Sequence, residues 1–278
     1  MNSDIIKPED YIEPACVLCE PAYGQEIPVR TVPQQRIIEK MDEYMSRRDY
    51  AGAERHLLYW LEEAQLGNDL GGELMLRNEL VGHYRKTGNR AQALVHIQKA
   101  LELVRELGFE GTVSAGTTYT NCGTALNAFG ENEQSLALFE KARQAYESSD
   151  HVRTDLMGGL YNNMALTCAA LKRFDEARAY YAKAMDMMKQ TEYGELEQAI
   201  TCLNLANLIE AEQGLEAGEH EIFNLLDQAC DLLKTEGIPR DGYYAFVLEK
   251  CAPTFGYYGY FAAAQELKET SEKIYAGH

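Results

Sequence analysis

Apolar side chains recur at helical spacing along most of the chain, and the most regular stretch runs from Tyr161 to Ala184. Two runs place their apolar residues at i, i+3, i+4 and i+7: Tyr161, Met164, Ala165 and Cys168 in the first, then Ala177, Tyr180, Tyr181 and Ala184 in the second. A short link containing Lys172 and Arg173 separates them. The pattern predicts two short helices folded back on each other, with one apolar side that needs neighbours to cover it.

The same context returns at a fixed distance along the sequence. Ala142 lies 42 residues before Ala184, Ala100 lies another 42 residues earlier, and Ala229 follows 45 residues after Ala184. A period of this length is typical of stacked helical repeats, in which each hairpin buries its apolar side against the next. We therefore expect an all-α fold, an α-solenoid of about six helical hairpins. The expected hairpins span about 34–64, 69–106, 113–147, 152–190, 192–234 and 240–276, within a solenoid of residues 34–278.

Glycine marks two of the expected turns, and a charged stretch marks a third. Gly88 and Gly130 lie where a helix should end in a residue of positive φ. In the fifth hairpin, the glutamate-rich stretch 211–221 around His220 predicts a longer turn that bulges from one edge of the solenoid. We interpret this stretch as a solvated acidic loop, with contact to a basic partner or weak cation binding as the alternative.

The repeated residues resemble those of the tetratricopeptide repeat family. That family places an aromatic residue and a Leu-small pair on the first helix, and a small residue, an aromatic residue and an alanine on the second. The matching residues here are Tyr161, Met164, Ala165, Ala177, Tyr181 and Ala184. Cys168 departs from the pattern, and so does the period, since about 34 residues is commonest in the family.

Longer repeats of about 42 residues are similar to those of kinesin light chains and of bacterial peptide-sensing regulators. The resemblance covers roughly Gln34 to Tyr275 and implies a right-handed solenoid whose first helices line a concave groove. It also suggests a bacterial protein. The resemblance specifies the fold and names no partner.

Composition narrows the choice of partner and compartment. A formal net charge of -18 argues against nucleic-acid and anionic-membrane surfaces and favours a basic or neutral partner, although acidity also keeps a protein soluble. Neither a signal peptide nor a membrane-spanning helix is expected. Five of the seven cysteines fall at core-like places in expected helices, as small buried hydrophobes of a reducing compartment: Cys122, Cys168, Cys202, Cys230 and Cys251. We expect a cytoplasmic protein.

Residues 1–33 predict an extended arm, because five prolines interrupt any helical period: Pro8, Pro14, Pro21, Pro28 and Pro33. The arm carries enough apolar side chains to pack along the solenoid, and we hypothesise that it fills the groove as a built-in ligand. Cys16 and Cys19 form a CxxC pair, but no second pair follows to complete a zinc site. We interpret them as two incidental thiols and expect no metal.

Amides and hydroxyls recur on the first helices of the hairpins, where the expected groove lies. The candidate groove residues are Asn78, Arg85, Thr120, Asn121, Thr124, Asn127, Asn162, Asn163, Asn204 and Asn207. An amide both donates and accepts hydrogen bonds, which suits an extended peptide backbone. The alternative for Asn121, Asn163 and Asn204 is that they match the family's fold consensus and bridge adjacent helices.

The sequence carries no phosphate-binding glycine loop, HExxH or GxSxG motif, and its histidines are scattered. We therefore predict a non-catalytic scaffold without cofactors that binds a protein or an extended peptide. The alternative is a peptide-responsive regulator, similar to bacterial pheromone sensors, that acts through a separate effector. Homodimerisation through the C-terminal hairpin is a further hypothesis, based on four tyrosines: Tyr243, Tyr244, Tyr257 and Tyr258.

Overall fold

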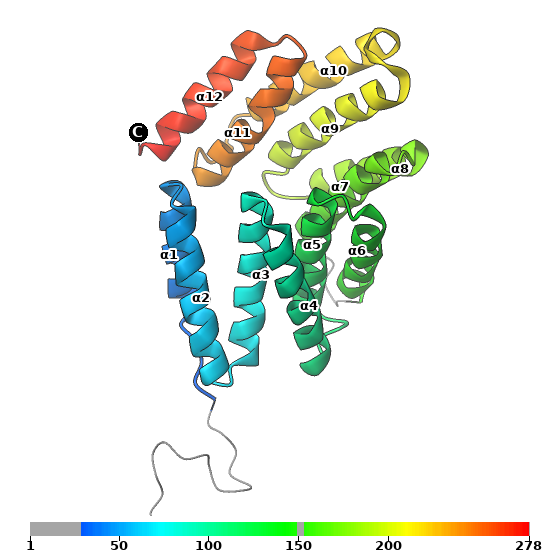
Figure 1. Cartoon of the computed structure of the whole chain (residues 1–278). Helices are drawn as coiled ribbons and strands as arrows, with labels where there is room; N and C mark the ends of the chain where they lie inside the picture. The colour runs from blue at the N-terminus through cyan, green and yellow to red at the C-terminus, as the bar shows by residue number, and fades with distance from the viewer. Residues whose placement is uncertain (1–28, 149–152, 278) are drawn as a thin grey trace, which may run out of the picture.

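Residues 29–148 and 153–277 are described by a computed structural model, and all of its regular elements are α-helices (Figure 1). The helices are α1 (Gln34–Ser46), α2 (Tyr50–Leu66), α3 (Leu70–Thr87), α4 (Arg90–Glu106), α5 (Val113–Ala128), α6 (Asn132–Glu147), α7 (Thr154–Ala170), α8 (Phe174–Met188), α9 (Glu195–Gln213), α10 (Leu215–Leu233), α11 (Gly242–Tyr257) and α12 (Phe261–Tyr275). The predicted all-α solenoid of six hairpins is confirmed. Most of the predicted arm, with Cys16 and Cys19, lies outside the described residues.

The alanines that set the sequence period lie in the core between helices. Ala100, Ala142, Ala184 and Ala229 are all fully buried. Each hairpin packs its apolar side against the neighbouring hairpin. The core therefore continues along the array as successive clusters of buried side chains. The repeat therefore reflects one packing contact used several times.

Polar caps and left-handed residues define where helices begin and end. The side chains of Asp49, Asp69 and Asn89 accept hydrogen bonds from backbone N–H groups in the first turns of α2, α3 and α4. Gly88 and Gly130 have φ angles of 74° and 81°, as their positions in the sequence predict. These caps fix short turns, and short turns keep paired helices antiparallel.

The turn of the fifth hairpin differs from the prediction. The stretch 211–221 does not form a bulging loop, because α9 continues to Gln213 and α10 begins at Leu215. Gly214 alone, with φ 84° and ψ 161°, reverses the chain. Alanine, glutamate and glutamine are strong helix formers, so the extra residues lengthen both helices.

The odd-numbered helices lie side by side, and the even-numbered helices pack behind them. From α3 to α11 each odd-numbered helix contacts the next. Four of the even-numbered helices pack between their own partner and the next odd-numbered helix, namely α2, α4, α6 and α8. We call the surface of the odd-numbered helices that is turned away from the even-numbered ones the inner face. Exposed side chains on these helices therefore gather on one continuous surface.

The array bends so far that its two ends meet. In Figure 1 the C-terminal end of α12 lies near the top of α1, and α9 to α12 are drawn above the first three hairpins. Arg48, in the turn between α1 and α2, forms an ion pair of 3.3 Å with Glu249 of α11. The pKa of Tyr275 in α12 is raised by burial and by the charge of Glu249. The first and last hairpins are thus in direct contact.

Candidate binding face

All ten predicted groove residues lie on odd-numbered helices, and several of them bond to the neighbouring helix. The Asn78 amide donates to the Thr118 hydroxyl at 3.0 Å and so joins α3 to α5. Asn204 of α9 donates to the Asn162 side-chain oxygen at 3.1 Å, and Asn162 is only 6 % exposed. The Asn162 side-chain oxygen and the Asn78 amide nitrogen are therefore used within the solenoid, while the buried Asn78 side-chain oxygen has no partner among the described residues. The role of both residues in peptide binding stays a prediction.

Four further candidates bond within their own hairpin or to α11. The hydroxyls of Thr120 and Thr124 donate to backbone carbonyls one turn earlier in α5, at 2.9 and 2.8 Å. Asn127 donates to the Asn132 side chain across the turn between α5 and α6. Asn207 is exposed, and its side-chain oxygen accepts a hydrogen bond from Tyr258 in α11. Of these four, Asn207 keeps an accessible amide nitrogen.

Asn121, Asn163 and Arg85 keep their polar groups free within the described part of the chain. Asn121 and Asn163 are half-buried, stand one period apart on α5 and α7, and form no side-chain hydrogen bond to another described residue. Arg85 at the end of α3 is exposed and forms no ion pair there, yet desolvation lowers the pKa of its guanidinium. These three residues therefore keep donors that no described residue uses.

A second set of residues on the same face was missed by the sequence analysis. Glu210 of α9 accepts hydrogen bonds from the hydroxyls of Tyr257 and Tyr258, both at 2.7 Å, and Glu197 accepts one from Tyr243. The sequence pattern predicts these tyrosines only as a dimer surface. Their distance of 46 to 48 residues from the glutamates, about one repeat, was the signal that could have found them.

Only part of the proposed tyrosine patch is accessible. Tyr244 and Tyr258 are 4 % and 7 % exposed, and the Tyr244 hydroxyl donates to the backbone of Leu233. The exposed members are Tyr243 and Tyr257. Dimerisation through this hairpin stays a prediction, and it can involve the rings of only these two tyrosines.

Two hollows in the described structure lie away from the predicted groove residues. The larger, of about 580 Å³, lies at the N-terminal end of the array, and its lining includes His56, Tyr59 and Trp60. The smaller, of about 330 Å³, lies between α6, α7 and α8 and includes Met164 and Tyr180. Neither hollow contains an inner-face asparagine.

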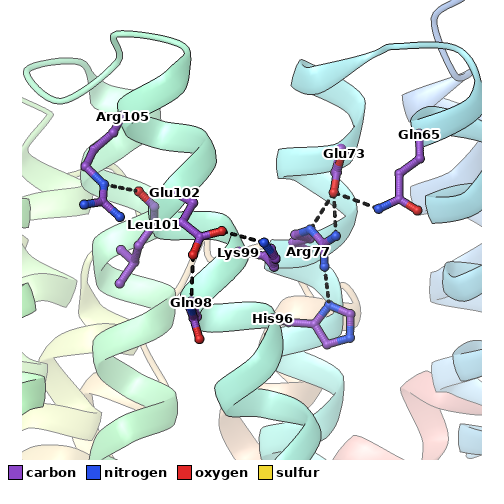
Figure 2. A network of polar contacts seen from close by, with 9 residues as sticks. All are labelled: Gln65, Glu73, Arg77, His96, Gln98, Lys99, Leu101, Glu102 and Arg105. Carbon is purple, nitrogen blue, oxygen red and sulfur yellow. Dashed lines mark hydrogen bonds and ion pairs between the residues drawn. The ribbon is translucent and has the colours of Figure 1, made fainter.

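A buried polar network fixes α3 against α2 and α4 (Figure 2). Arg77, 6 % exposed, donates from Nε to Glu73 at 2.8 Å and from Nη1 to Nδ1 of His96 at 3.2 Å, and Gln65 donates to the same Glu73 carboxylate. Burial, with the nearby Arg77 charge, lowers the pKa of His96 to about 4. Nδ1 of the neutral imidazole accepts from the guanidinium, so this network is structural.

The described residues offer little to metal or thiol chemistry. Within residues 29–148 and 153–277 no group of three or more His, Cys, Asp or Glu side chains is placed to hold a metal ion. Burial raises the pKa of Cys122 and of Cys251 to about 12, and that of Cys202 to about 11. These thiols stay protonated and buried, as small core residues do.

No helix in the described ranges combines the length and apolar character that crossing a bilayer requires. This finding concerns the helices alone.

Comparison with known proteins gives matches to helical repeats. Two tetratricopeptide repeat models match residues 73–148 and 159–192. A Drosophila melanogaster protein described as a BBSome complex member BBS4 homolog is 30% identical over 154 residues, which cover 54% of this chain and 29% of that protein. The chain thus spans less than a third of that relative's length.

One solved structure supports the fold, and a second is reported as a match. The crystal structure of BtubC (BKLC) from P. vanneervenii superposes with a TM-score of 0.51 at 16% identity, over 89% of this chain and 92% of that one. A putative kinesin light chain with nearly identical TPR-like repeats from Podosopora anserina gives 0.48 at 16% identity, over 72% and 94%.

The family models match the third and fourth hairpins and most of the second, and these hairpins bury the repeated alanines against one another. Sequence match and observed stacking therefore agree. Residues 73–148 and 159–192 are tetratricopeptide repeats, and the twelve described helices form a solenoid of that type.

Proposed function

We propose that the protein is a non-catalytic scaffold that holds an extended segment of a partner protein on its inner face. Tetratricopeptide repeats generally bind proteins, and the Drosophila relative is by its name a member of a complex. The charge of -18 favours a partner that is not acidic.

The observation that carries the proposal is the pair of half-buried, unbonded amides at equivalent positions of α5 and α7. Asn121 and Asn163 each offer two donors and an acceptor that no described residue uses. A half-buried polar group left without a hydrogen bond loses free energy unless water or a ligand satisfies it. An extended backbone presents N–H and C=O groups in alternation and can satisfy both.

A matched pair of variants tests this proposal. We expect Asn121→Ala combined with Asn163→Ala to lose the partners that the wild-type protein captures from its native extract. The control is Gln134→Ala combined with Gln228→Ala, which removes two exposed amides from even-numbered helices. Circular dichroism establishes that both variants fold. The proposal is wrong if the two double variants and the wild type capture the same proteins.

A peptide-responsive regulator is the second candidate, and one observation favours it. The Arg48–Glu249 ion pair joins the ends of the array through two exposed side chains, and a weak contact of this kind is easily broken. A ligand on the inner face that changes the pitch would open or close this contact. Small-angle scattering with and without a captured peptide separates the two functions, because only the regulator predicts a changed radius of gyration.

A further inference from the structure

Exposed aromatic side chains form a stripe along α11, the last odd-numbered helix. Tyr243, Phe246 and Tyr257 are 49, 48 and 68 % exposed. They stand at i, i+3 and i+14, which places them on one side of the helix. The rings of Tyr243 and Phe246 stack with centroids 6.4 Å apart. Aromatic rings exposed along one stripe are typical of a contact surface.

Glutamates from α9 are held beside both ends of this stripe. Glu210 accepts from Tyr257 and Tyr258, and Glu197 accepts from Tyr243. Burial and the neighbouring carboxylates raise the pKa of Tyr243 and of Tyr258 above the ordinary value, so both hydroxyls remain donors at neutral pH. Each carboxylate is thus fixed in orientation next to an aromatic ring.

These carboxylates keep unused capacity for a cation. A carboxylate has about four acceptor positions, and Glu210 spends two on tyrosines while Glu197 spends one. Within the described ranges neither glutamate is paired with a basic side chain, whereas Glu212, in the last turn of α9, is paired with Arg178. Two half-buried carboxylates without a basic partner in the described ranges therefore lie beside exposed rings.

We propose that the inner faces of α9 and α11 bind a partner segment that carries two arginine side chains about six residues apart. The inference rests on the proposed function and names the partner's chemistry. A guanidinium pairs with a carboxylate through parallel hydrogen bonds and stacks on an aromatic face, which are the two groups present at each end. The two ends are separated by 14 residues of helix, about 21 Å, and an extended chain covers that distance in about six residues.

Lys250 limits what the middle of the segment carries. It lies midway along the stripe, seven residues from Tyr243 and seven from Tyr257. Seven residues of helix are about 10 Å, so a basic side chain at the centre of the partner segment would lie beside this ammonium group and be repelled by it. We therefore expect arginine at the two ends and neutral or acidic residues between them, which separates this face from a general site for polycations.

Defined peptides test the proposal by fluorescence polarisation. The probe is a labelled ten-residue peptide with arginines at positions 2 and 8 and serine or threonine elsewhere, and the reference peptides replace both arginines with glutamine or place them three residues apart. We expect the probe to bind at least tenfold more tightly than either reference, with an affinity that falls as salt rises. Equal binding of the glutamine peptide overturns the proposal, as does no binding of the probe.

Charge-matched variants localise the effect. Glu197→Gln with Glu210→Gln should weaken probe binding at least tenfold, while Glu219→Gln with Glu272→Gln, on even-numbered helices, should change it less than twofold. Phe246→Ala removes one exposed ring without touching a carboxylate, and we expect it to weaken binding about threefold or more. Equal losses in both double variants would mean non-specific attraction to an acidic protein and would overturn the proposal.

The outcome is separable from that of the proposed function. If the glutamate variants capture the native partners as the wild type does, while the Asn121 and Asn163 variant does not, the arginine inference fails and the scaffold stands. Sedimentation velocity tests a second copy of the chain as the occupant. A dimer that is lost in Phe246→Ala would assign the stripe to self-association and overturn the inference.

Discussion

Gly123 in α5 is a position where a single methyl group should be costly. A Cβ built on Gly123 would lie 2.6 Å from Cε1 and 2.8 Å from Cδ1 of Phe139, a ring that is fully buried against α5. The atoms in the way belong to a packed aromatic ring, so α5 and α6 must separate slightly to admit the methyl group.

Two opposing terms set the expected size of the effect of Gly123→Ala. Alanine gains about 0.5–1 kcal/mol over glycine inside a helix. Overpacking of a filled core costs about 1–3 kcal/mol. The next hairpin holds a fully buried alanine, Ala165, at the equivalent place, so the architecture can adjust and the cost stays moderate. We expect a net destabilisation of about 1–2 kcal/mol.

Thermal denaturation followed by circular dichroism measures this difference against a matched substitution. Gly159 lies inside α7, and a Cβ there meets nothing within 4 Å. Gly159→Ala therefore has only the helical gain, and its Tm should rise by about 1–4 °C, whereas that of Gly123→Ala should fall by about 2–8 °C. If Gly123→Ala melts at or above the wild-type temperature, the Gly123–Phe139 contact does not limit the spacing of α5 and α6.

Three further predictions use polar contacts. Arg48→Glu should increase the radius of gyration measured by scattering, and adding Glu249→Arg should restore it; an unchanged radius would show that the ion pair does not hold the ends together. Asp69→Ala removes a buried carboxylate that accepts hydrogen bonds from two backbone N–H groups, and it should lower the free energy of unfolding in urea by about 2–3 kcal/mol. Asp49→Ala, at an exposed cap, should lower it by about 1 kcal/mol. The folded-state pKa of His96, about 4, lies below its ordinary value, so the unfolded chain binds this proton first as pH falls. His96 should therefore contribute stability above pH 6.5 that is lost between 6.5 and 4, about 3 kcal/mol at most, and His96→Gln should show a shallower loss.

The repeat could be read from the sequence because its main constraint is local and small. Ala100, Ala142 and Ala184 are small residues that are fully buried, and such positions recur once per hairpin. Gly88 likewise marks a helix end, because few other residues adopt its φ of 74° without strain. Sterics of this kind tolerate few alternatives, so they leave a clear pattern.

The turn of the fifth hairpin was not readable by the same reasoning. The charge density at 211–221 predicts a solvated loop, but exposed glutamates are equally common on the solvent face of a long helix. Gly214 is the only residue of that stretch with a left-handed φ, and the fold reverses there. Helix propensity, and not polarity, decided the length of α9 and α10.

The sequence alone does not show which of the inner-face amides form hydrogen bonds between helices. Hydrogen bonds between odd-numbered helices join residues about one repeat apart, 40 for Asn78 and Thr118 and 42 for Asn162 and Asn204, so spacing alone makes every such pair a candidate for bonding. Asn121 and Asn163 are also 42 residues apart, yet they do not bond to each other. Which pairs meet depends on the local separation of the helices, and a repeat pattern does not encode that separation. Asn121 and Asn163 therefore differ from the other pairs for a physical reason. They have the sequence spacing of a pair that joins two helices but form no such hydrogen bond, so their donors and acceptors remain available to a ligand.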